Sequence, residues 1–302
     1  MNTQENFYGL GIAPGILEVL QRLNFKIPTS IQTKSIPIAV QGKDVMGIAQ
    51  TGTGKTIAFG VPLIQEVLQG KGKGLVVLPT RELAIQVHDV FQKIGGSLGV
   101  KSAILIGGEF IGRQIRELQR NPDILIGTPG RIIDHLNQRT LHLGKVKMLV
   151  LDEADRMLDM GFEPQLARIL QEIPKERQTM LFSATMPEQI MKIANRYMKL
   201  PIRIEIAPSG SALKEVTQEL FIVNEDSKKK LLGKVLTDHR GSVLMFTRTK
   251  IRAKKITHML REMGHHAAEI HSDRSMAQRT QAIEGFKSGR YRILVATDIA
   301  SR

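Results

Sequence analysis

A glycine-rich stretch near the N-terminus contains residues that could bind a chain of phosphates. It consists of Ala49, Gln50, Thr51, Gly52, Thr53, Gly54, Lys55 and Thr56. This fits the phosphate-binding loop pattern, with Ala49 in place of the usual first glycine. In that pattern successive backbone N–H groups wrap the phosphates, and the following helix points its positive end at them. Lys55 would neutralise the β and γ phosphates, and the Thr56 hydroxyl would ligate Mg²⁺.

A second polar segment follows the apolar run at residues 148–151. It is the tetrad Asp152, Glu153, Ala154 and Asp155. Asp152 would hold Mg²⁺, and Glu153 would orient and deprotonate an attacking water. Acidic residues after a strand also fit a solvated helix start, because the N-terminus of a helix favours negative charge. Together with the phosphate loop, the tetrad predicts a site for nucleotide hydrolysis.

Short apolar runs that alternate with helical patterns must position these residues. The sequence predicts strands at 44–48, 74–78, 102–106, 123–126, 147–151 and 179–182, with helices at 57–68, 81–94, 112–120, 132–136, 164–172 and 187–198. This alternation is typical of an α/β fold with a mostly parallel sheet covered on both faces. Since ligands bind outside the carboxyl ends of such strands, we expect the phosphate loop, Asp152 and Ser183 at one edge of the sheet.

A second α/β block is predicted after a linker. Residues 207–215 are mostly small and turn-forming, so we predict a first domain at 1–206, a linker at 207–215 and a second domain at 216–302. The second domain begins with a predicted strand at 216–223 and ends soon after another at 292–296. We therefore expect it to be incomplete.

The composition excludes several classes of protein and site. The chain contains no cysteine, which excludes disulfides and thiolate metal sites. It has no run of about 18 apolar residues, so no membrane span is predicted. The absence of cysteine fits a cytoplasmic location, which we expect. The net charge of +14 fits either solubility or a polyanionic partner. Aromatic residues make up 4% of the chain, which favours recognition of a nucleic-acid backbone over base stacking.

From about Phe7 to Arg302, the chain resembles the DEAD-box ATP-dependent RNA helicases. The tetrad from Asp152 gives that family its name, and the segment from Phe25 to Gln32 resembles the family's adenine-reading motif, with Phe7 as its upstream aromatic. The resemblance implies that Gln32 hydrogen-bonds the adenine edge and that Phe25 stacks on the base. A buried amide that pairs with one base edge can reject other bases, because they would leave its polar atoms unpaired. It implies ATP and Mg²⁺ as cofactors. Asn24 stands where a glycine is usual, and we expect this change to be harmless.

The resemblance also implies RNA as a partner, single-stranded or duplex, bound without sequence specificity through phosphates and 2′-hydroxyls. In the first domain the implied RNA-binding residues are Pro79, Thr80, Arg81, Gly108, Thr128, Pro129, Gly130 and Arg131, and in the second they are Arg248, Arg279 and Thr297. Ser183 and Thr185, which would bond Asp155, resemble the motif that couples hydrolysis to unwinding. Each of these segments by itself would be an ordinary turn or helix cap.

The implied architecture is a RecA-like ATP-binding domain followed by a partial second RecA-like domain. The implied activity is ATP hydrolysis that locally unwinds or remodels RNA duplexes, with ribosome-assembly and RNA-decay complexes as candidate settings. The family's last motifs, which carry arginine fingers, would lie beyond Arg302. We therefore expect a C-terminally truncated chain that binds ATP, hydrolyses it slowly and does not unwind RNA. The overall resemblance, including residues 6–10, implies a bacterial, RhlE-like member of the family. The alternatives are an ATP-gated RNA clamp without unwinding activity and a P-loop NTPase that acts on DNA or protein.

Overall fold

A computed structural model describes residues 6–206 and 217–297 of the chain. The chain divides into two compact units, Met1–Ala212 and Leu213–Arg302. Each unit is described by itself. The linker predicted at 207–215, and the residues that follow Thr297, lie outside the described residues.

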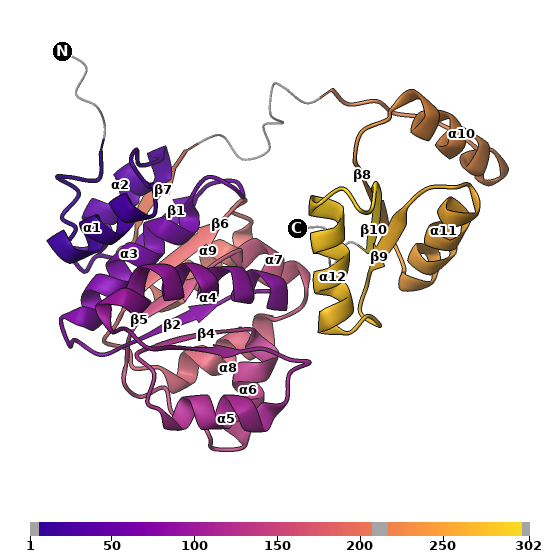
Figure 1. The fold of residues 1–302 in the computed structure, drawn as a ribbon. Coiled ribbons are helices and arrows are strands. Elements are labelled where there is room, and N and C mark those ends of the chain that lie inside the picture. Colours follow the sequence, from indigo (N-terminus) through magenta and orange to yellow (C-terminus); the bar gives the residue numbers. More distant parts are fainter. Residues whose placement is uncertain (1–5, 207–216, 298–302) are drawn as a thin grey trace, which may run out of the picture. The chain divides into compact units, whose positions relative to one another are not determined.

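The first unit is built on a parallel sheet of seven strands in the order β3-β4-β2-β5-β6-β1-β7 (Figure 1). The strands are β1 Val45–Ile48, β2 Lys73–Val77, β3 Ser102–Leu105, β4 Ile124–Gly127, β5 Val146–Leu151, β6 Gln178–Ser183 and β7 Ile202–Glu205. Six of them match predicted strands, and β7 was not predicted. The parallel α/β fold expected from the sequence is therefore confirmed.

Helices cover both faces of this sheet. They are α1 Pro14–Arg22, α2 Ser30–Ala39, α3 Lys55–Leu68, α4 Arg81–Gly95, α5 Ile111–Gln119, α6 Pro129–Asn137, α7 Ala154–Asp159, α8 Glu163–Glu172 and α9 Glu188–Tyr197. Neighbouring residues of one strand enter different apolar cores. Val76 packs in the core that contains α1 to α4, whereas Leu75 and Val77 pack in the core that contains α6 to α9. The two cores arise because successive side chains of a strand point to opposite faces of the sheet. Since helices cover both faces, a ligand site is expected at the carboxyl ends of the strands.

The second unit has a smaller parallel sheet of three strands in the order β8-β10-β9. Its strands are β8 Val243–Thr247, β9 Ala267–Ile270 and β10 Ile293–Thr297, and its helices are α10 Glu225–Asp238, α11 Lys250–Glu262 and α12 Met276–Lys287. The strand predicted at 216–223 is wrong for the described residues 217–223, which have no regular structure. Leu220 and Ile222 are 88% and 93% exposed, because no described strand pairs with them or buries their side chains.

Candidate functional site

The glycine-rich loop joins the carboxyl end of β1 to the first turn of α3, as predicted. Gly52 and Gly54 have φ angles of 84° and 91°, in the left-handed region that only glycine adopts without strain. The Thr53 hydroxyl donates to the Gln50 carbonyl oxygen at 2.7 Å. A Cβ atom at Gly54 would collide with the Gln32 amide. The loop conformation therefore requires glycine at these positions.

Lys55 is the first residue of α3 and is 6% exposed. Its Nζ atom donates to the carbonyl oxygen of Ala49 at 3.0 Å, so the side chain lies across the loop. Thr56 follows it in the first helical turn, where the helix leaves unpaired N–H groups and a partial positive charge. An anion held by this loop would replace the Ala49 carbonyl as the partner of the Lys55 ammonium.

Gln32 ties the start of α2 to the same loop. Its Oε1 atom accepts from the Thr29 N–H at 2.9 Å, and its Nε2 atom donates to the Gly54 carbonyl oxygen at 3.0 Å. Phe25 lies upstream and is 38% exposed, so its ring is partly accessible. The φ angle of Asn24 is 63°, which explains why glycine suits that position and why asparagine is tolerated. Phe7, the upstream aromatic, is buried in the core.

Asp152 and Glu153 follow β5 at the same edge of the sheet. Asp152 is 3% exposed, and this burial raises the pKa of its carboxyl to about 6, although the nearby Lys55 ammonium opposes the rise. Glu153 has a φ of 51°, an uncommon conformation for a residue with a side chain. Its N–H donates to Asp152 Oδ1 at 2.9 Å, and its carboxylate pairs with Arg156.

Asp155 connects the acidic segment to the carboxyl end of β6. Its Oδ2 atom accepts from the Thr185 N–H at 2.9 Å and from the Thr185 hydroxyl at 2.8 Å. Its own N–H donates to the Ser183 hydroxyl oxygen at 3.2 Å. Burial acts to raise the pKa of Asp155, but the hydrogen bonds from Thr185 and Ser183 outweigh it, and the pKa lies below its usual value. Ser183 is therefore a partner of the acidic segment, and the N-cap of the next helix is Pro187.

The first-unit residues that resemble RNA-binding motifs lie at the carboxyl ends of β2, β3 and β4. Thr80 is the N-cap of α4, and Thr128 is the N-cap of α6, with Pro129 and Gly130 in the next turn. The Arg81 guanidinium packs so closely on Gly108 that a Cβ atom there would collide with it. The Nη1 atom of Arg131 donates to the Glu109 carbonyl oxygen at 3.2 Å. Both arginines thus contact the segment that follows β3.

Three predicted residues belong to the second unit. Arg248 is exposed just after β8, Thr297 is buried at the end of β10, and Arg279 is half-buried on α12. In the parallel pairing of β8 with β10, Thr297 lies opposite Thr247, next to Arg248. Arg248 and Thr297 therefore share the carboxyl edge of the smaller sheet.

Sequence reasoning missed Arg156, whose side chain is buried and pairs with that of Glu153. The spacing of Glu153 and Arg156 could have indicated this pair, because residues three apart on a helix lie on the same face. Among the described residues there is no cluster of three or more histidine or acidic side chains that could hold a metal ion. In the same residues, no helix is long and apolar enough to span a membrane.

Comparison with known proteins identifies two matching family models and several similar proteins. The family model for DEAD/DEAH box helicases matches residues 29–193, and the helicase conserved C-terminal domain matches residues 227–302. The DEAD-box ATP-dependent RNA helicase CshA of Geobacillus kaustophilus is 44% identical over 98% of this chain, and the CshA of Listeria monocytogenes is 43% identical over the same share. The chain spans 64% and 58% of the lengths of these two relatives.

Solved structures of such proteins resemble the chain as well. A DEAD box protein from the hyperthermophile Methanococcus jannaschii is 39% identical, with a TM-score of 0.64 over 98% of this chain and 81% of its own. Saccharomyces cerevisiae Dbp5 bound to RNA and ADP BeF3 is 28% identical, with a TM-score of 0.87 over 99% of this chain and 77% of its own. With the phosphate loop, the acidic tetrad and the Ser183–Asp155–Thr185 contacts at one sheet edge, these matches show that the chain belongs to the DEAD/DEAH box helicase family.

Proposed function

We propose that these residues provide the ATP site and RNA-binding residues of an ATP-dependent RNA helicase, an enzyme that hydrolyses ATP to unwind or remodel RNA duplexes locally. The observation that carries this proposal is the gathering of Lys55, Asp152 and the Asp155–Thr185 contact at the carboxyl edge of one parallel sheet. Nucleotide hydrolysis needs a phosphate cradle, a carboxylate for the metal and a base for water. The names of the CshA relatives, and the RNA bound to Dbp5, support RNA as the polymer.

The nucleotide would be held from its base to its phosphates. Gln32 would bond the adenine edge and Phe25 would stack on the ring, while residues 49–56 would wrap the phosphates. Mg²⁺ would be held by Thr56 and Asp152, and when bound it would neutralise charge on the phosphates. A hydroxyl and one carboxylate fit this ion, because Mg²⁺ prefers oxygen ligands and keeps several waters in nucleotide sites. Glu153 would orient the attacking water and accept its proton.

The RNA backbone would lie along the residues after β2, β3 and β4. These residues are Pro79, Thr80, Arg81, Gly108, Thr128, Pro129, Gly130 and Arg131, and the second unit would add Arg248, Arg279 and Thr297. Helix N-termini and arginines are typical phosphate contacts, and the net charge of +14 favours a polyanion. Ser183, Asp155 and Thr185 would couple hydrolysis to RNA remodelling, because they join the acidic segment to β6.

Finer assignments are proposals of the same kind. We assign residues 1–206 to the ATP-binding domain, 207–215 to a linker and 216–302 to the helicase C-terminal domain. The cytoplasm would be the location, and ribosome-assembly or RNA-decay complexes would be the setting. A place in the RhlE-like branch rests on the overall resemblance, including residues 6–10, whereas the bacterial relatives named above are CshA proteins.

The decisive experiment is steady-state ATP hydrolysis by this chain with single-stranded RNA, with duplex RNA, with DNA of the same sequence and with no nucleic acid. The proposal is supported if RNA stimulates the hydrolysis of ATP and DNA does not. Equal stimulation by DNA and RNA would replace it with a P-loop NTPase that acts on either polymer. ATP-dependent RNA binding without turnover, even at high enzyme concentration, would favour an ATP-gated clamp.

A further inference from the structure

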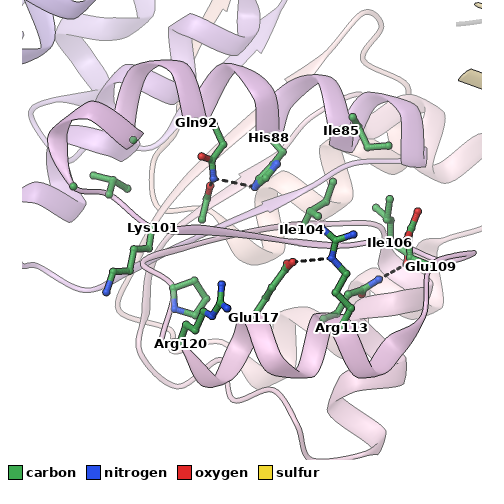
Figure 2. A pocket seen from close by; sticks show the side chains of 16 residues that line it. Ile85, His88, Gln92, Lys101, Ile104, Ile106, Glu109, Arg113, Glu117 and Arg120 are labelled. Atoms are coloured by element: carbon green, nitrogen blue, oxygen red, sulfur yellow. Dashed lines mark hydrogen bonds and ion pairs between the residues drawn. The ribbon is translucent and has the colours of Figure 1, made fainter.

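A groove of about 850 Å³ lies on the first unit, between α4 and α5 and along β3 (Figure 2). In the order of the sheet, four strands separate β3 from β1, the strand that leads into the phosphate loop. No residue that lines the groove was assigned to nucleotide or RNA above. The groove is therefore a candidate for a separate binding site.

The floor of the groove is the open edge of the sheet, because β3 pairs with β4 on one side and with no described strand on the other. The carbonyl oxygens of Lys101 and Leu105 accept bonds on the β4 side, from Ile124 N–H at 3.1 Å and Thr128 N–H at 3.0 Å. Backbone groups of successive residues point to opposite sides of a strand. The N–H and C=O groups of Ser102 and Ile104 therefore point away from β4, into the groove, where another extended chain could pair with them.

Apolar side chains line the α4 side of this edge. Ile104 is half-buried and Ile106 is buried, and both pack with the core beneath α4. Ile85 of α4 faces them across the groove, as Figure 2 shows. Because alternate side chains of an added strand would point toward α4, this wall favours apolar residues at every second position of the occupant.

The charges of the groove are divided between its two ends. Lys101 and Arg120 lie at the end where β3 begins, both exposed, and within the described residues neither forms an ion pair with an acidic side chain (Figure 2). Arg113, in contrast, is paired with Glu117 at 3.4 Å, and Glu109 lies at the other end. Carboxylates on an occupant would therefore be favoured beside Lys101 and Arg120.

We infer that this groove binds an extended acidic peptide segment of a protein partner, which adds as a strand to the open edge of β3. Its backbone pairs with Ser102 and Ile104, its alternate apolar side chains cover Ile85 and Ile104, and its carboxylates lie beside Lys101 and Arg120. An RNA strand fits less well, because its phosphates would meet the isoleucines and Glu109 and cannot donate hydrogen bonds to the carbonyl oxygens of the β3 edge.

A designed peptide tests this inference on the full chain. The probe is fluorescein-labelled Val-Thr-Val-Glu-Val-Asp, which places valines on one side of the strand and carboxylates near one end. We expect saturable binding by fluorescence anisotropy, weakened about tenfold or more by K101E with R120E, since charge reversal turns attraction into repulsion. The matched control is R168E with K175E, which makes the same charge change at exposed positions elsewhere and should leave binding unchanged.

Backbone N-methylation of the probe tests strand addition directly. One peptide carries N-methyl groups on the three valines, and a second carries them on the other three residues. Only one alternate set of N–H groups can face β3, so one peptide should lose binding and the other should keep it. Equal behaviour of the two peptides, or no saturable binding of the parent probe, would overturn the inference. The inference would also be overturned if the probe fails to bind and single-stranded RNA binds the parent chain but not the K101E with R120E variant.

Discussion

The carboxylate of Glu153 and the guanidinium of Arg156 form a buried ion pair, with Glu153 Oε2 and Arg156 Nη1 3.2 Å apart and each side chain 7% exposed. Glu153 is also in the left-handed region, with a φ of 51°. The proposed water-activating carboxylate is thus fixed in position by the first turn of its own helix. Arg156 therefore acts as a positioning residue, whereas Glu153 would contact the reacting water.

Removal of Arg156 leaves a buried carboxylate without this partner. Arg156→Met should lower the free energy of unfolding by about 3 kcal/mol and reduce the kcat of ATP hydrolysis more than the affinity for ATP. Urea unfolding at neutral pH and steady-state kinetics measure both quantities. The control is Arg113→Met, which breaks an exposed pair with Glu117 and should change stability by less than about 0.5 kcal/mol. A double variant with Glu153→Gln that is destabilised by the sum of the two single changes would argue against direct coupling.

Glu153→Gln should keep ATP binding and lose turnover. The amide has almost the same shape but cannot accept a proton from water, and general base catalysis contributes about 10²–10⁴-fold. A fluorescent ATP analogue measures affinity, and phosphate release measures turnover. Glu172→Gln, at an exposed position at the end of α8, should retain full turnover. If Glu153→Gln also retained it, the assignment of the base would be wrong.

Gln32→Glu removes one hydrogen-bond donor from the phosphate loop and adds a negative charge there. The new carboxylate can still accept from the Thr29 N–H, but it cannot donate to the Gly54 carbonyl oxygen as the amide does at 3.0 Å. We expect ATP affinity to fall about tenfold or more and the preference for ATP over GTP to shrink, since a lost polar match at a base edge removes discrimination. Competition between ATP and GTP for a fluorescent analogue measures this preference, which Gln119→Glu should not change. An unchanged preference in Gln32→Glu would remove Gln32 from the base site.

Thr185→Val removes the hydroxyl that donates to Asp155 at 2.8 Å and keeps the backbone N–H that donates at 2.9 Å. The loss of this bond to a charged group should lower the free energy of unfolding by about 1.5–3 kcal/mol. ATP affinity should stay unchanged, while the stimulation of hydrolysis by RNA should fall. Thr237→Val, at an exposed position of α10, controls for the threonine-to-valine change itself. Full RNA stimulation in Thr185→Val would contradict a coupling role for this contact.

His135 should make stability depend on pH. It is fully buried, with Nδ1 2.8 Å from the Thr140 hydroxyl and Nε2 3.2 Å from Gln114 Oε1. Burial lowers the pKa of His135 below its ordinary 6.5, helped by the positive charge of Arg131 and opposed by Asp134. Below pH 6.5 the unfolded chain therefore binds the proton first, and stability falls as the pH decreases.

Urea unfolding between pH 7.5 and 5 measures this dependence. His135→Gln should flatten the curve below pH 6.5, because glutamine keeps polar atoms near Gln114 and Thr140 but does not titrate. His142→Gln, at an exposed position, serves as the control. An unchanged slope in His135→Gln would show that other groups cause the loss of stability in acid.

The sequence was informative wherever local pattern and chemistry agreed. Gly52 and Gly54 could be placed in a loop because the turn needs φ values that other residues avoid. The strand predicted at 216–223 failed over the described residues 217–223 for the opposite reason, since a run of apolar residues forms a strand only where a neighbour offers backbone partners. Arg156 was missed because the spacing from Glu153 indicates a shared helix face but does not reveal that the face is buried.

The sequence by itself determined the parallel α/β fold, the phosphate loop and the acidic segment, because these depend on local periodicity and on motifs with fixed spacing. Only the tertiary structure decided which distant residues meet. It placed the Gln32 amide on the Gly54 carbonyl and the Thr185 hydroxyl on Asp155, and it left the edge of β3 open beside Lys101. The order of strands in the sheet sets these contacts, and that order follows from the packing of the whole unit.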